Sequence, residues 1–270
     1  MTDLIHRRTA GSPEADGADC AVGAVKADRA AWRRELLRRI GTHTIAKGLA
    51  TTLGISAFFI VYFWVLHHPF RVPIYMPVTA LDRLIAFEPA ALPLYFSLWL
   101  YVGLAPALLD SGRALASYGL ATLATSVIGL GIFIAWPTAV PPAEIDWTLH
   151  PSIEFLKVVD LAANACPSMH VAFAVLTGIW LHRLLRDMHS GTWPLALNWA
   201  WCGGIVYSTL ATRQHVVLDV LAGAALGALV AAVLGFAQRA RQHPCAVDAP
   251  QRRPPGVSRD HRLPETAPSP

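Results

Sequence analysis

Long stretches without charged residues dominate the pattern of this chain. Asp, Glu, Lys and Arg are absent from six windows: 48–70, 89–109, 114–143, 161–182, 188–212 and 220–238. Each window can hold the roughly 20 apolar residues that a helix needs to cross a hydrocarbon core about 30 Å thick. Because lipid offers no partners to backbone N–H and C=O groups, helix is the expected state of each window. The pattern predicts an all-α polytopic membrane protein, a six-transmembrane-helix bundle.

The expected helix boundaries divide the chain into four parts. We expect membrane helices over residues 46–67, 92–110, 113–136, 169–186, 195–212 and 215–238. These form one membrane domain, 46–238, flanked by segments of different composition. Residues 1–28 are rich in Ala, Gly and Asp, and 239–270 are rich in Pro and Arg, so both ends are expected to be disordered tails. Residues 29–45 place apolar side chains at helical spacing among arginines, which predicts an interfacial amphipathic helix.

Short-range features predict how the spans pack. Only Ser111 and Gly112 separate Asp110 from Arg113, so the second and third spans should form a tight antiparallel hairpin. Gly223 and Gly227, with small residues around them, predict a face of the last span that approaches another helix closely.

Composition and charge exclude several classes of protein. The chain is 54% hydrophobic and 15% charged, with a mean hydropathy of +0.42, whereas soluble domains carry about 25% charged residues. An ordinary soluble enzyme is therefore excluded. The four cysteines show no CxxC spacing, which argues against a disulfide scaffold or a zinc knuckle. The net charge of +4 is not gathered on one face, so nucleic acid is not an expected partner.

The distribution of basic residues predicts the topology. If six spans cross the membrane in alternating directions, one side of the membrane has only four of the 22 Lys and Arg residues: Arg71, Arg83, Lys157 and Arg213. By the positive-inside rule, both termini are then cytoplasmic and the loops 68–91 and 137–168 face outward. We expect a multi-pass protein of the cell membrane with its bilayer as a partner.

Two histidines and an aspartate fall at matching positions of this layout. His170 lies at the outer start of the fourth span and His215 at the outer start of the sixth. Asp219 follows His215 by four residues, so on a helix its carboxylate shares a face with the imidazole. If the two rings flank one phosphoryl group, they should lie within about 8 Å of each other.

This set of side chains suits nucleophilic substitution at phosphorus. His215 would attack, Asp219 would orient it and stabilise the imidazolium, and His170 would protonate the departing oxygen. Arg213 supplies planar donors for phosphoryl oxygens. Ser168 and the N–H groups at the start of the fourth helix add further donors.

The flanking residues resemble a known family. Pro167-Ser168-Met169-His170 is similar to the Pro-Ser-x-His signature of the type 2 phosphatidic acid phosphatase superfamily, and Arg213 through Asp219 resembles its His-x-x-x-Asp signature. The resemblance implies a metal-independent lipid phosphatase or phosphotransferase without a cofactor, which works through a phosphohistidine at His215.

The chain departs from that family at the first signature, a Lys followed at a distance by Arg-Pro. The segment 137–142 lies at the expected place, but Ala143 stands where a basic residue would help. Arg213 and Lys157 are the candidates to replace the missing cation. In this departure the chain resembles the branch of the superfamily that contains inositol phosphorylceramide synthases. Transfer of a phosphoalcohol group therefore stays an alternative to hydrolysis.

The residues are also compatible with three other interpretations. A transporter with a His-Asp relay would suit six spans, although its polar residues are expected near the midplane. A zinc or iron ion could be bound by His170, His215 and Asp219, whose side chains are plausible ligands, although we expect no metal. A vanadate-dependent oxidation, as in the related haloperoxidases, is chemically conceivable because vanadate mimics phosphate.

Overall fold

The computed structural model describes residues 31–154 and 164–242, with side chains described as far as residue 235. The expected tail 1–28 lies outside the described residues. So does the expected tail 239–270, except that 239–242 continue the last helix.

Helices make up most of the described chain. Residues 31–41 are helical and precede the named elements. In chain order these are α2 (Thr44–His67), β1 (Ile74–Tyr75), α3 (Ala80–Leu84), η1 (Pro89–Ala91), α4 (Leu92–Phe96), α5 (Leu98–Leu108), α6 (Gly112–Ala135), β2 (Thr138–Ala139), η2 (Trp147–Leu149), α8 (Met169–Asp187), α9 (Thr192–Ala211) and α10 (Val217–Gln242). The all-α prediction is confirmed, with one short pair of strands added to it.

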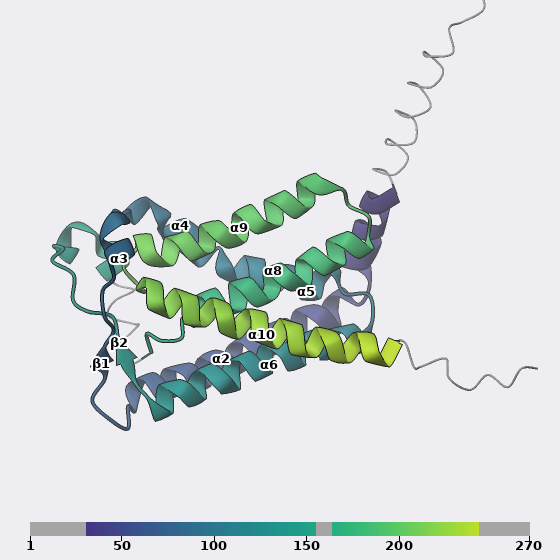
Figure 1. Ribbon diagram of the computed structural model, residues 1–270. Coiled ribbons are helices and arrows are strands. Elements are labelled where there is room, and N and C mark those ends of the chain that lie inside the picture. The colour runs from purple at the N-terminus through teal and green to yellow at the C-terminus, as the bar shows by residue number, and fades with distance from the viewer. Residues whose placement is uncertain (1–30, 155–163, 243–270) are drawn as a thin grey trace, which may run out of the picture.

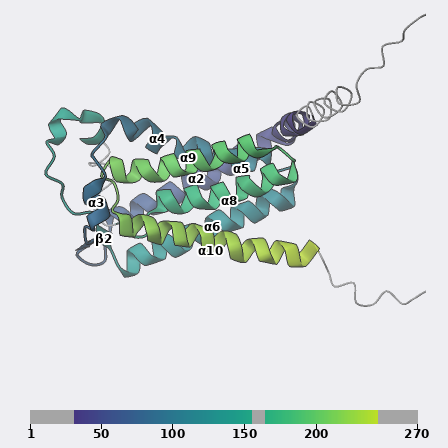
Figure 2. The same cartoon turned by 45° about the horizontal axis from the view of Figure 1, so that its top comes forward.

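The long helices lie lengthwise beside one another in a bundle (Figures 1 and 2). The strands and α3 gather at one end of the bundle, and helix 31–41 and the C-terminal end of α10 lie at the other. α8 is the central helix, since it packs against α5, α6, α9 and α10.

Close approach explains why α10 packs so tightly on α8. A methyl group placed on Gly227 would lie 2.3 Å from the carbonyl oxygen of Ala172, and one on Gly223 would lie 2.3 Å from that of Ser168. Only glycine leaves room for the neighbouring backbone at these positions, as the small-residue pattern predicts.

Buried hydrogen bonds join the central helix to its neighbours. The Tyr101 hydroxyl on α5 donates to Asn198 Oδ1 on α9 at 2.7 Å, and Asn198 Nδ2 donates to the Gly178 carbonyl oxygen on α8 at 3.0 Å. The hydroxyls of Tyr118 on α6 and Thr177 on α8 are 2.9 Å apart. Apolar packing between helices has no directional preference, so these bonds specify which faces meet.

Four segments are long and apolar enough to cross a membrane: Thr44–His67, Pro89–Leu108, Gly112–Ala135 and Val217–Gly235. They correspond to the first, second, third and sixth predicted spans. α8 and α9 have 19 and 20 residues but are less apolar, since α8 carries His182, Arg183 and Arg186, and α9 carries Asn198. The count of six spans therefore remains a prediction.

The second predicted span, 92–110, is interrupted rather than continuous. It begins earlier, with η1, α4 and α5 in succession, and it ends at Leu108 because Leu109 is extended. Pro93 has no N–H to continue a helical ladder through η1 into α4. Ser97 then links α4 to α5 and donates its hydroxyl hydrogen to the Leu94 carbonyl oxygen at 2.6 Å.

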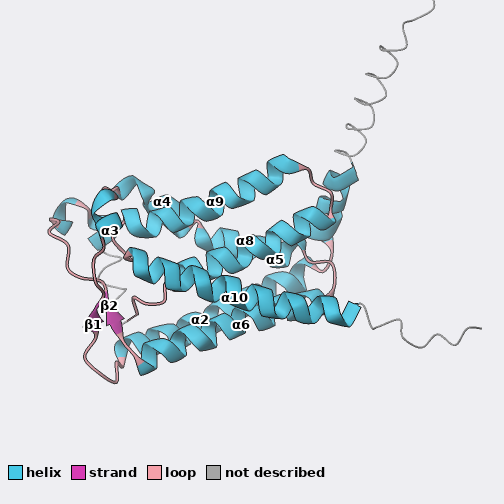
Figure 3. Cartoon of the chain, in the orientation of Figure 1, coloured by secondary structure: helices cyan, strands magenta, loops and turns pink. Residues whose placement is uncertain are grey.

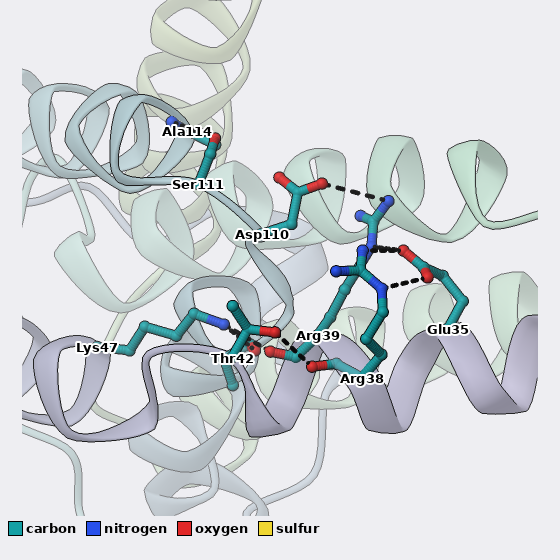
Figure 4. Close-up of polar contacts among 9 residues, drawn as sticks. Glu35, Arg38, Arg39, Thr42, Lys47, Asp110, Ser111 and Ala114 are labelled. Atoms are coloured by element: carbon teal, nitrogen blue, oxygen red, sulfur yellow. Dashed lines mark hydrogen bonds and ion pairs between the residues drawn. The ribbon is translucent and has the colours of Figure 1, made fainter.

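The helix 31–41 is tied to the turn between α5 and α6 (Figure 4). Glu35 accepts hydrogen bonds from Arg38 at 2.6 Å and from Arg39 at 2.7 Å, and Arg39 lies 3.9 Å from Asp110. The bond from Arg38, reinforced by that from Arg39, lowers the pKa of Glu35 to about 2. Lys47 donates to the Ala107 carbonyl oxygen at 3.1 Å. The expected helix in 29–45 is present, and its contact with a leaflet stays a prediction.

At the opposite end, two short strands pair (Figure 3), and a third segment adds an isolated bridge. β1 runs parallel to β2, with Ile74 opposite Thr138, and Thr138 also forms a bridge with Asn164. The Cys166 N–H donates to Thr138 Oγ1 at 2.8 Å. These bonds hold the polypeptide that leads directly into α8.

Candidate functional site

The start of α8 holds His170 at the end of the bundle where the strands lie. Ser168 is the N-cap of this helix and accepts a hydrogen bond from the Val171 N–H at 3.4 Å, as its residue type predicts. The Ser168 N–H donates to the Asp219 carbonyl oxygen at 3.0 Å. This main-chain bond fixes the start of α8 against the first turn of α10.

Two aromatic residues from the second predicted span, Tyr95 on α4 and Trp99 on α5, lie beside His170. The Tyr95 ring stacks on the imidazole with centroids 4.2 Å apart, and the Tyr95 hydroxyl lies 3.3 Å from His170 Nδ1. The Trp99 ring approaches it edge-on at 5.7 Å. Because Nδ1 meets the hydroxyl, Nε2 is the nitrogen left for other chemistry.

His215 and Asp219 form the second half of the site. His215 Nδ1 is 3.6 Å from Asp219 Oδ2. This distance allows an ion pair but is too long for a hydrogen bond. Asp219 is completely buried, and its Oδ2 accepts a hydrogen bond from the Val216 N–H at 3.0 Å. A proton on Nδ1 facing the carboxylate would leave the Nε2 lone pair for a reaction.

The two imidazoles share one small space. Their ring centroids are 6.3 Å apart, within the separation that the sequence predicts. His170 Nε2, His215 Nδ1 and Asp219 Oδ1 are buried and, among the described residues, have no hydrogen-bond partner. Unsatisfied buried polar atoms are costly, so a polar ligand or water is expected as a partner for these three atoms.

The predicted binding residues have different surroundings. Ser168 is completely buried at the start of α8, and its Oγ is bonded to the Val171 N–H. Arg213 donates from Nη1 to the Asp82 carbonyl oxygen at 2.9 Å and from Nη2 to that of Ile85 at 2.7 Å. Lys157 lies outside the described residues. The cation expected for a phosphate therefore stays a prediction.

Three contacts near the histidines were not expected from sequence: Tyr95 and Trp99 lie beside His170, and Asp82 is bonded to Val217, two residues after His215. The aromatic pair is four residues apart on one helical face, but aromatic residues near span ends are common in membrane proteins. Asp82 follows Thr79 by three residues, a capping pattern that signals only the start of a short helix.

Metal ligation has no support in the described part of the chain. There, no group of three or more His, Cys, Asp and Glu side chains is arranged to hold an ion. The roles of nucleophile, orienting partner and acid that the sequence predicts for His215, Asp219 and His170 stay a prediction.

Comparisons with known proteins bear on this arrangement. No curated protein and no solved structure matches the chain. Residues 111–242 match the family model of the PAP2 superfamily, and this stretch includes α6, α8, α9 and α10 with both histidines and Asp219. Together with the apolar helices, the match marks a membrane protein. The resemblance that the two histidine signatures indicate is confirmed: residues 111–242 match the PAP2 superfamily.

Proposed function

We propose that this protein is a lipid phosphate phosphatase or phosphotransferase that works through a phosphohistidine at the outer face of the membrane. Members of the PAP2 superfamily are phosphatases or phosphotransferases. The observation that carries the proposal is the pair of imidazoles, whose ring centroids are 6.3 Å apart, with the buried Asp219 carboxylate 3.6 Å from His215 Nδ1.

In the first step, His215 Nε2 attacks phosphorus. The N–P bond forms while the P–O bond to the lipid breaks, and His170 gives its Nε2 proton to the leaving oxygen. Asp219 stabilises the positive charge that develops on His215. The first N–H groups of α8 point toward negative charge at the phosphoryl group.

In the second step, water or an alcohol attacks the phosphohistidine. His170 takes the proton of the attacking hydroxyl, the N–P bond breaks and His215 is regenerated. Water completes a hydrolysis, and an alcohol completes a transfer. Since both reactions share the first step, the same residues serve the phosphoalcohol transferase alternative.

An apolar cavity that is lined in part by Trp99, a neighbour of His170, supports a lipid as the substrate. It has a volume of about 390 Å³ and lies among α2, α5, α6 and α8, with mainly apolar walls that include Phe58, Trp99, Leu130 and Phe173. Trp99 touches both this cavity and His170. An alkyl chain in the cavity would therefore keep its head group close to the reacting nitrogen.

The position of the histidines favours this proposal over a transporter. His170 is the second residue of α8 and His215 precedes α10 by two residues, so both lie at helix ends. A transport site built on a relay is expected near the middle of the spans instead.

The test is a turnover assay of the purified full-length protein in detergent or bilayer discs. A panel of lipid phosphates is supplied with and without alcohol acceptors, and free phosphate and transfer products are measured. We expect release or transfer of phosphate, inhibition by vanadate, no loss of activity with chelators, and an acid-labile phosphohistidine at His215. Turnover by a His215→Ala protein at the normal rate would contradict the proposal.

A further inference from the structure

The outer segment that contains α3 is bonded to the turn that carries His215. We name residues 79–88 the clasp loop. At its end, the Glu88 N–H donates to the Ala211 carbonyl oxygen at the last residue of α9, at 3.0 Å. This bond joins parts of the chain that the sequence separates by four predicted spans and a long outer loop. The clasp loop therefore lies along the turn between α9 and α10.

Asp82 makes the central contact of the clasp loop. It is 4% exposed, and its Oδ1 accepts a hydrogen bond from the Val217 N–H at 2.7 Å, at the first residue of α10. Its Oδ2 accepts from the Thr79 N–H at 2.7 Å and the Thr79 hydroxyl at 2.6 Å. A carboxylate at a helix N-terminus is stabilised by the helix dipole. Asp82 therefore caps two helices at once, α3 and α10.

Arg213 holds the same turn from the other side. Its backbone is left-handed, with φ of 56°, a conformation that is uncommon for a residue with a side chain. Its guanidinium donates to two clasp-loop carbonyl oxygens, those of Asp82 and Ile85. A planar fork with fixed donor directions suits such a paired contact, which lysine cannot reproduce.

His215 lies between these two attachments, two residues after Arg213 and two before Val217. We propose that Asp82 and Arg213 are positioning residues, which set the place of the His215 imidazole relative to His170 through the clasp loop. This inference rests on the proposed role of His215 as the nucleophile. It gives Arg213 a task other than the phosphate contact that its residue type suggests.

The expected effect of a loosened clasp loop is on the chemical step. Asp82→Asn keeps the shape of the side chain but removes its charge and weakens its bonds to Val217 and Thr79. Because a displacement of about 1 Å can cost roughly 100-fold in rate, we expect kcat to fall 10- to 100-fold. KM should stay within about twofold, since substrate binding is not the interaction removed.

Variants of Arg213 test the positioning role a second time. In Arg213→Lys the charge is kept but the fork is lost, so a positioning role predicts a fall in kcat close to that of Arg213→Ala. A role in binding phosphate predicts the opposite split, with KM raised by Arg213→Ala and largely restored by Arg213→Lys. Restoration of KM by lysine would overturn the assignment of Arg213.

Matched controls separate positioning from general damage to the outer face. Glu144 is an exposed carboxylate of the outer loop 137–168. Arg83 is an exposed arginine of α3. Glu144→Gln and Arg83→Ala should leave kcat and KM unchanged.

A measurement that needs no turnover completes the experiment. The rate of carbethoxylation of each histidine by diethyl pyrocarbonate is followed by peptide mass spectrometry in the intact protein, with exposed His67 as the internal standard. We expect Asp82→Asn to change the rate at His215 at least threefold and to leave His67 unchanged.

The outcomes are distinguishable. If the wild-type protein turns over no lipid phosphate, the proposed function fails, and the rate at His215 still decides the positioning claim. An unchanged rate at His215, or an unchanged kcat in an active protein, would overturn the inference. A lowered thermal stability with kcat and His215 reactivity intact would also overturn it, because the clasp loop would then be a structural contact alone.

Discussion

His170 and His215 flank the same space but have different neighbours. His215 has a buried carboxylate 3.6 Å away, whereas His170 has the Tyr95 hydroxyl at 3.3 Å and an aromatic ring stacked on it. A negative neighbour favours a histidine that becomes positively charged during the reaction. This difference in surroundings is what we expect if the two histidines have the different tasks that we propose.

This difference predicts an asymmetry between two alanine variants. His215→Ala should abolish turnover of every substrate. His170→Ala should still allow slow phosphorylation of His215 by a phosphate ester whose leaving group needs no protonation. The measurement compares kcat for a lipid phosphate with kcat for an aryl phosphate in both variants. Equal losses for the two substrates in His170→Ala would contradict the acid role.

The residues of the site differ in how far the sequence could predict them. His170, His215 and Asp219 could be predicted because each lies within a short run whose spacing carries the information. Tyr95 and Asp82 could not, since Tyr95 meets a residue 75 positions later and Asp82 one 135 positions later. Contacts of that separation depend on how the helices pack, and no local pattern encodes them.

At the scale of elements, the contact between α8 and α10 positions both halves of the site. Gly223 and Gly227 face the backbone of α8, and the Ser168 N–H is bonded to the Asp219 carbonyl oxygen. Small residues predicted this closeness, but they did not identify α8 as the partner. The interruption of the second span at α4 was also not predicted, although Pro89 and Pro93 are plain helix-start signals.

The fit of α10 against α8 gives a prediction for stability. Gly227→Ala would place a methyl group 2.3 Å from the Ala172 carbonyl oxygen, a backbone atom that cannot move aside alone. We expect it to destabilise the fold by about 1–3 kcal/mol. Gly131→Ala on α6 meets nothing within 4 Å and should be neutral or stabilising. Thermal unfolding in detergent measures both, and equal stability of the two variants would contradict this account.

The clasp loop predicts a dependence of stability on pH. Burial opposes the charge of Asp82, but the hydrogen bonds from Thr79 and Val217 outweigh it and hold the pKa of Asp82 below its ordinary value of 3.8. A lowered folded-state pKa stabilises the fold fully above pH 3.8, and this stabilisation is lost as the pH falls through the folded-state pKa. The difference in Tm between wild type and Asp82→Asn should therefore be constant from pH 7 to about 5 and shrink below pH 3.8. A difference that grows in acid would have the wrong sign.

At the scale of the whole molecule, the helical bundle has two unlike ends. One end has the strands, the clasp loop and both histidines, and the other has helix 31–41 with its arginines and the C-terminal end of α10 (Figures 1 and 2). The uneven distribution of Lys and Arg predicted such a polarity before any contact was known. The orientation of the bundle in a membrane follows from charge rather than from packing, because helices pack equally well either way up.

We expect the histidine end to face outward and both termini to be cytoplasmic. In a background where the four cysteines are replaced by serine, His150→Cys should react with an impermeant maleimide in intact cells. Asp187→Cys, an exposed position at the other end of α8, should react only after permeabilisation. The reverse pattern would contradict the topology.

The parts that surround His170 and the turn of His215 do not all come from the stretch that matches the PAP2 superfamily. That stretch begins at residue 111, whereas Asp82, Tyr95 and Trp99 precede it and touch the residues within it. A chimera made by exchanging residues 111–242 between two members would therefore bring together a catalytic half and a scaffold half that had not evolved together. A segment moved into another membrane protein would have to begin before the clasp loop to keep these contacts. Its boundary is set by hydrogen bonds rather than by sequence similarity.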